Sequence, residues 1–176
     1  MRHVAFVCLL LSACKQAPTP APAPAPRPPP PVALAAAWPP DGGEKAPMPP
    51  LAEALMRKMA NALDGGKDAT VRDLFMNNLQ ANGVLDCGAI DLGAKVTGAR
   101  DSAVARVASL KGKTVFKGAD DGHQFDVRRD GAVGPCKAQV DIVLFRTKTT
   151  WDVGGKPEDH DTLLLAVRGA WFFLAW

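Results

Sequence analysis

The chain has 176 residues, a formal net charge of +3 and no tyrosine. Residues 51–176 hold 17 Lys and Arg against 16 Asp and Glu, so they lack the basic excess typical of nucleic-acid binding. The serines of this part, Ser102 and Ser109, stand outside any Gly-x-Ser-x-Gly motif, which argues against a serine hydrolase.

The first fourteen residues have the layout of an export signal. Arg2 supplies a positive charge, residues 4–11 form a short apolar run, and Ser12 and Ala13 are the small residues that a cleavage site needs. The apolar run is far shorter than the roughly 20 residues of a membrane-spanning helix. One interpretation is an ordinary secretory signal in which Cys14 occurs by chance.

The run Leu11-Ser12-Ala13-Cys14 resembles the lipobox of bacterial lipoproteins at every position. The resemblance implies that residues 1–13 are a signal peptide, that Cys14 receives a diacylglycerol, and that its amine receives a further acyl chain such as palmitate. Two or more chains give stable anchoring, because each buried methylene contributes about 0.8 kcal/mol. It also implies a place in the bacterial cell envelope. The residue after the cysteine is Lys15 and not aspartate. By analogy with enterobacterial lipoproteins, this favours the outer membrane, with the protein facing the periplasm.

Residues 14–50 are expected to be the lipid anchor and a disordered linker rich in proline and alanine. Fourteen of the 16 prolines lie here, and each fixes φ and removes an amide donor. Such a tract favours polyproline II and would reach on the order of 100 Å, which suits a spacer across the cell wall. The apolar stretch Val32-Ala33-Leu34-Ala35-Ala36-Ala37-Trp38 interrupts it. This stretch is either a short helix or docking motif, or low-complexity Ala/Pro sequence.

The cysteines can be assigned from the expected compartment. Cys8 would leave with the signal and Cys14 would be lipidated, which leaves Cys87 and Cys136. An exported compartment is oxidising, so we predict a disulfide between these two. In the chain-entropy model such a bond stabilises by roughly 4 kcal/mol. The alternative is a reactive thiol at Cys87 with a histidine beside it.

Residues 51–176 are expected to form one domain that begins with helices. Three helices are predicted: Leu51 to Leu63, Asp68 to about Gln80, and Asp101 to Leu110. In the first, apolar residues recur every four positions from Leu51, and Asp64-Gly65-Gly66 ends it. Asn82-Gly83 is expected to stop the second. Between the second and third, Val84 to Ala99 should hold a short strand near Cys87 and loops.

From residue 114 onward the pattern becomes typical of strands. The predicted strands are Thr114–Phe116, Gln124–Arg128, Gln139–Trp151, Thr162–Val167 and Ala170–Trp176. Gly154 to Asp161 is expected to be a polar loop, and Arg168-Gly169 a hairpin turn. The last strand is apolar on both faces, so Trp171, Phe173 and Trp176 are candidates for lining a pocket.

These elements predict an α+β fold, with N-terminal helices packed on a curved antiparallel sheet. The element order and the Gly169-Ala170-Trp171-Phe172 run resemble the nuclear-transport-factor-2-like (SnoaL-like) cone folds. The resemblance implies a cavity between helices and sheet that takes varied ligands, with no fixed set of catalytic residues. A cystatin-like or other α+β sheet is equally compatible.

Two runs hold side chains that can bind metals: Asp120-Asp121-Gly122-His123 and Glu158-Asp159-His160-Asp161. Both runs fall where a turn between strands is expected, and Asp, Gly and His are ordinary turn residues; neither run matches a calcium loop. We therefore predict no catalytic residue, no metal site and no cofactor. An envelope metal protein that uses His123 and His160 is a further alternative.

The sequence thus predicts a non-enzymatic envelope lipoprotein whose domain is a binding or scaffolding module. Cys14 would tie it to the membrane, and its partner would be an unidentified envelope protein or the cell wall, not nucleic acid. The alternative is a small-molecule binder or enzyme with a cone-type pocket under Trp171 and Trp176. A deep pocket lined by those tryptophans would favour the alternative, whereas a filled core and an exposed apolar patch would favour the binding module.

Overall fold

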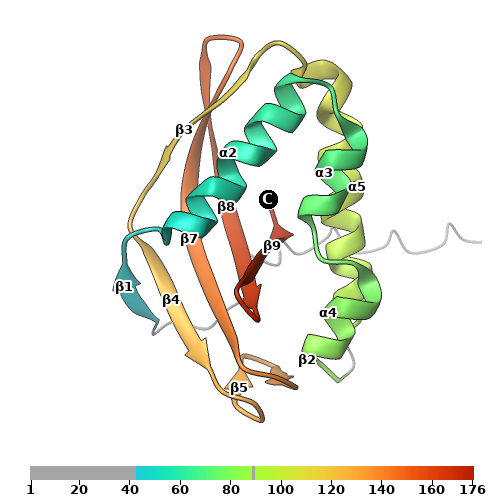
Figure 1. The fold of residues 1–176 in the computed structure, drawn as a ribbon, viewed down its shortest axis with the longest axis vertical. Coiled ribbons are helices and arrows are strands. Elements are labelled where there is room, and N and C mark those ends of the chain that lie inside the picture. The colour runs from blue at the N-terminus through green and yellow to red at the C-terminus, as the bar shows by residue number, and fades with distance from the viewer. Residues whose placement is uncertain (1–42, 89) are drawn as a thin grey trace, which may run out of the picture. The chain divides into compact units, whose positions relative to one another are not determined.

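The structure is a computed structural model that describes residues 43–88 and 90–176. The predicted signal peptide, Cys14 and the linker up to residue 42 lie outside the described residues. The described part is a mixed α+β fold, as predicted, with helices packed against a mostly antiparallel sheet (Figure 1). Its helices are α2 (Pro50–Asp64), α3 (Asp68–Leu74), α4 (Asn78–Val84) and α5 (Leu92–Leu110).

The strands belong to two sheets. The main sheet contains β1 (Glu44–Ala46), β3 (Thr114–Ala119), β4 (Gly122–Val127), β7 (Ile142–Val153), β8 (Lys156–Val167) and β9 (Ala170–Ala175). The small sheet contains β2 (Leu85–Asp86), β5 (Ala132–Val133) and β6 (Cys136–Ala138).

The centre of the main sheet is the long hairpin of β7 and β8, which pair in register along all 12 of their residues. β9 continues the sheet beyond β8. On the other side, β4 pairs with the first half of β7 and β3 with the second half, and β1 borders β4. Every one of these pairings is antiparallel.

The prediction of a polar loop over Gly154 to Asp161 is wrong. Only Gly154 and Gly155 form the turn, both at positive φ, and β8 begins at Lys156. The polar half of β7 has backbone donors and acceptors that need partners, and the first half of β8 supplies them. The polar side chains there line strands, not a loop.

Side chains alternate along the strands, so the main sheet has two distinct faces. One face, called here the helix face, carries Phe145 and Trp151 of β7. It meets the helices through Arg57 of α2, whose guanidinium carbon lies 5.9 Å from the centre of the Phe116 ring, and Phe116 in turn packs on Trp151. Figure 1 shows α2 crossing in front of β7 and β8, with α3 and α5 beside β9.

Helix α2 forms as predicted, but its buried side differs from the predicted stripe. Pro50 occupies its first turn and Gly65 follows its last residue. Met56, Met59 and Leu63 are fully buried, whereas Leu51 is 62% exposed. Ala52 is also fully buried, so the buried stripe runs from Ala52 through Met56 instead of from Leu51 through Leu55.

The predicted second helix is two helices with an extended break between them. Phe75 is buried and forms an isolated parallel bridge with Phe173, and the Met76 amide donates to the Phe173 carbonyl oxygen at 3.4 Å. The open edge of β9 thus gains a short partner, which a continuous helix could not supply. Asn77 then caps α4 through a reciprocal pair of hydrogen bonds with Gln80. Asn82-Gly83, predicted to be a stop, lies inside α4.

The loops predicted up to Ala99 are also wrong, because α5 begins at Leu92. Its first turn is capped by Asp91, whose side chain accepts from the Ala94 amide at 2.9 Å. Gly93 lies so close to the side chain of Asn78 that a Cβ atom there would collide with it. The glycine that suggested a loop therefore permits close contact between α4 and α5. The short strand predicted near Cys87 is confirmed as β2.

Candidate functional site

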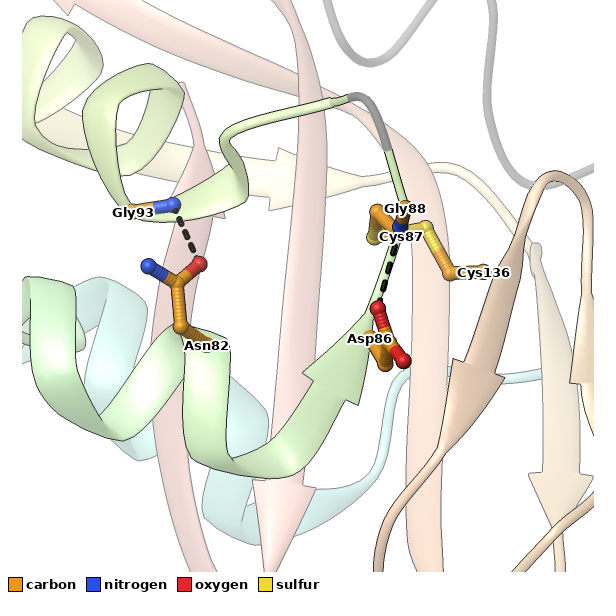
Figure 2. The surroundings of a disulfide bond; sticks show 6 residues. All are labelled: Asn82, Asp86, Cys87, Gly88, Gly93 and Cys136. Carbon is orange, nitrogen blue, oxygen red and sulfur yellow. Dashed lines mark hydrogen bonds between the residues drawn. A yellow bond between two sulfur atoms is a disulfide. The ribbon is translucent and has the colours of Figure 1, made fainter.

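The predicted disulfide between Cys87 and Cys136 is present (Figure 2). Both cysteines are nearly fully buried, and the bond joins the end of β2 to the start of β6. Gly88 follows at a φ of 58°, and its amide donates to the Asp86 carboxylate at 3.0 Å. With both sulfur atoms in the bond, the alternative of a reactive thiol at Cys87 does not hold for this structure.

A cluster of aromatic side chains lies at the end of β9 on the helix face. Trp176 stacks on the His160 ring, with centroids 4.7 Å apart and planes within 5°, and meets Trp151 edge-on at 5.4 Å. The guanidinium carbon of Arg106 lies 5.4 Å from the Trp176 ring centre. We call Trp151, His160 and Trp176 the C-terminal aromatic cluster. A shift in the β8–β9 register between Leu163 and Leu164 gives Trp176 its place on this face.

A charged pair, Arg106 and Glu158, borders the cluster beside His160. Arg106 Nη2 donates to Glu158 Oε2 at 2.8 Å, and His160 Nε2 lies 3.5 Å from the same oxygen. Burial lowers the pKa of the His160 imidazole below its ordinary value of 6.5, and the charge of Arg106 adds to this effect. The hydrogen bond from Arg106 lowers the pKa of Glu158. Among the described residues, no hydrogen bond joins this imidazole to a hydroxyl or thiol, and its charged partner is the Glu158 carboxylate.

The interior beside the cluster is filled, and nearly all of its polar groups are paired. Thr149 Oγ1 lies 2.8 Å from Thr162 Oγ1 and accepts from the Trp151 indole at 2.8 Å. Phe145 and Phe173 expose no surface. The indole nitrogen of Trp176 is shielded and has no hydrogen-bond partner among the described residues. Large side chains therefore occupy the layer where a cone-type fold would have its cavity.

Two open grooves flank the turn between β8 and β9, and Arg168 lines both. The first has a volume of about 450 Å³ and lies against α4, with Met76, Val84 and Phe172 among its walls. The second has a volume of about 400 Å³ and lies at the start of α2, with Leu51 and Trp171 among its walls. Arg168 has a φ of 51° in the predicted turn. Its guanidinium makes no ion pair with any described residue.

The three residues predicted to line a pocket lie in different surroundings. Trp171 lines the second groove, Phe173 is buried with its ring 5.4 Å from that of Phe75, and Trp176 belongs to the C-terminal aromatic cluster. Arg106, Glu158 and Arg168 were not among the predicted site residues. Arg106 and Glu158 are 52 positions apart, and no local pattern links them. The predicted turn at Arg168 could have indicated an exposed cation.

The two runs with metal-capable side chains do not come together. His123 lies on β4, where its Nδ1 is 3.2 Å from the Gly43 carbonyl oxygen, and Asp121 pairs with Lys45 at 3.5 Å. His160 lies on β8 against Trp176. Among residues 43–88 and 90–176, no group of three or more His, Cys, Asp and Glu side chains could hold a metal ion.

Comparison of this chain with family models, with curated proteins and with solved structures finds no match. Within the described residues, no helix combines the length and apolarity needed to span a bilayer. The site must therefore be interpreted from its own chemistry.

Removing the disulfide with the double substitution Cys87→Ala/Cys136→Ala should lower the free energy of unfolding by roughly 4 kcal/mol, because the bond closes a loop over a separation of 49 residues. Urea-induced unfolding of the full chain measures this loss. Reductant should bring the wild type to the same stability and leave the variant unchanged. Equal stability of the oxidised wild type and the variant would contradict the structural role of the bond.

The lowered pKa of His160 predicts a stability that falls in mild acid. The unfolded imidazole takes up a proton near pH 6.5 and the folded one only at lower pH, so this contribution is complete above 6.5 and is lost as pH falls through the folded pKa. His160→Gln should flatten the decline in urea midpoint between about pH 7.5 and 5. His123→Gln, a change at an exposed histidine, is the control and should keep the wild-type slope. Glu158 acts at lower pH, because its pKa lies below 4.5.

Proposed function

We propose that this chain is a lipid-anchored protein of the bacterial cell envelope whose α+β domain is a binding or scaffolding module. The observation that carries the proposal is the buried Cys87–Cys136 disulfide, because such bonds persist in oxidising compartments outside the cytosol. It agrees with export through residues 1–13 and with lipid attachment at Cys14. The proline-rich linker would then hold the domain away from the membrane.

Support for a binding module comes from the filled interior and the open grooves. Phe145, Trp151 and Phe173 expose no surface between sheet and helices, so the interior is a packed core. The grooves on either side of Arg168 are instead open, and apolar side chains form much of their walls. An unpaired guanidinium between apolar walls suits a protein segment that places an acidic side chain beside apolar ones. We assign the partner to this chemical class.

The alternative function is a small-molecule binder or enzyme with a pocket of the nuclear-transport-factor-2-like kind. The observation in its favour is that Trp171 lines the second groove. Phe173 and Trp176 are instead engaged with Phe75 and His160. The contacts of these two residues therefore support the binding module over the pocket.

The anchor can be tested by intact-mass analysis of the full chain recovered from a bacterial membrane. The wild type should begin at an acylated Cys14, and Cys14→Ser should lose the lipid mass and leave the membrane fraction. Cys8→Ser is the matched control, because it changes a cysteine of the signal and keeps Leu11-Ser12-Ala13-Cys14 intact. A wild type that retains residues 1–13, or carries an unmodified Cys14, would refute the anchor.

The groove can be tested by a photo-reactive residue at Leu51, which is 62% exposed at the rim of the second groove. In the native membrane it should form one discrete protein adduct, and Arg168→Glu should reduce that adduct at least about 10-fold through charge reversal. The same photo-reactive residue at Val115, which is 53% exposed and lines neither groove, is the control. Equal labelling from both positions would count against a partner at this site.

A further inference from the structure

The face of the main sheet opposite the helix face is apolar over its central part. The strand register places Phe125, Leu144, Leu165 and Phe172 in one row across β4, β7, β8 and β9. Neighbours in such a row share a face of the sheet. Ile142 and Leu163 flank this row on the same face, because side chains alternate along each strand. We call these six residues the outer apolar patch.

The described helices pack mainly on the helix face or at the β9 edge of the main sheet. Helix α2 packs on the helix face, and α3 and α5 lie beside β9 (Figure 1). Near α4, Met76 and Val84 share a groove with Phe172 of the patch. Leu144 and Leu163 nevertheless expose no surface. A segment lying across this face would account for the burial of these two leucines.

The sequence offers one segment with the right composition before residue 43. Val32-Ala33-Leu34-Ala35-Ala36-Ala37-Trp38 is wholly apolar and free of proline, between Pro31 and Pro39. Seven extended residues span about 23 Å, whereas four neighbouring strands cover about 14 Å from first to last. The segment is thus long enough to cross the patch.

The chain enters the described structure at the rim of this patch. Gly43 lies directly beside the Phe125 ring, so closely that a Cβ atom there would collide with it, and Glu44 then pairs with Gln124. Only residues 39–42 separate Trp38 from Gly43, and this stretch can span up to about 17 Å. Trp38 can therefore reach the middle of the patch from the position of Gly43.

We propose that residues 32–38 dock on the outer apolar patch of their own domain. The docked segment buries Leu34 and Trp38 against β7, β8 and β9, and the folded unit then begins at residue 32. The spacer before the docked segment then ends at Pro31. This inference depends on the apolar faces alone and stands whether or not Cys14 is lipidated.

The test compares Leu34→Ser/Trp38→Ser with the matched control Ala23→Ser/Ala25→Ser, both in the full chain. Docking predicts that the first variant lowers the unfolding temperature by about 5 to 10 °C and that the control leaves it unchanged. Amides in the second half of β8 and in β9 should also exchange faster in the first variant. An unchanged unfolding temperature with unchanged exchange would overturn the proposal.

A double-substitution cycle locates the docking surface. Trp38→Ser and Leu144→Ala should each lower the unfolding temperature, and the combined variant should lose clearly less than their sum, because each removes the same contact. Additive losses would place residues 32–38 elsewhere and overturn the proposal. So would an unfolding temperature that rises with protein concentration together with a dimeric mass, because a second copy would then cover the patch.

Discussion

The β7–β8 hairpin is the element on which the rest of the domain depends. Its 12-residue register fixes which side chains face the helices and which face the opposite side. Trp151 and His160 fall on the helix face through this register, and so does Glu158, which receives Arg106. A shift by one residue would turn all three to the other face. The pairing of β7 with β8 therefore determines the C-terminal aromatic cluster as well as the sheet.

Local patterns predicted the elements that local chemistry decides. Pro50 and Gly65 bound α2, and Arg168-Gly169 turns between two apolar strands. Local patterns failed where a contact with a residue far along the chain determines the structure. The apolar spacing continues through Phe75 and therefore suggests one helix. The bridge to Phe173 overrides that preference, and residue 173 lies almost a hundred positions away. Likewise, Gly93 suggests a loop until Asn78 is known to lie against it.

The same distinction holds for the candidate site. Compartment and cysteine count predicted the Cys87–Cys136 pair, because elimination left a single pairing. Composition identified Trp171 and Trp176 as unusual, but it could not show that a register shift turns Trp176 onto His160. The pairing of Arg106 with Glu158 depends on the packing of α5 over the sheet and has no counterpart in the sequence. Local sequence patterns could not show these contacts, because the residues involved lie far apart in the chain.

The two grooves share Arg168 but have different structural support. The first is walled by α4, whose last residue, Val84, leads into β2 and the disulfide. The second is walled by the start of α2, where Leu51 is exposed and no covalent link is near. A partner in the first groove would therefore meet a wall that leads into the cross-linked segment, and one in the second would meet the first turn of α2. Because Arg168 serves both, a single acidic group could engage it while apolar residues on either side occupy the two grooves.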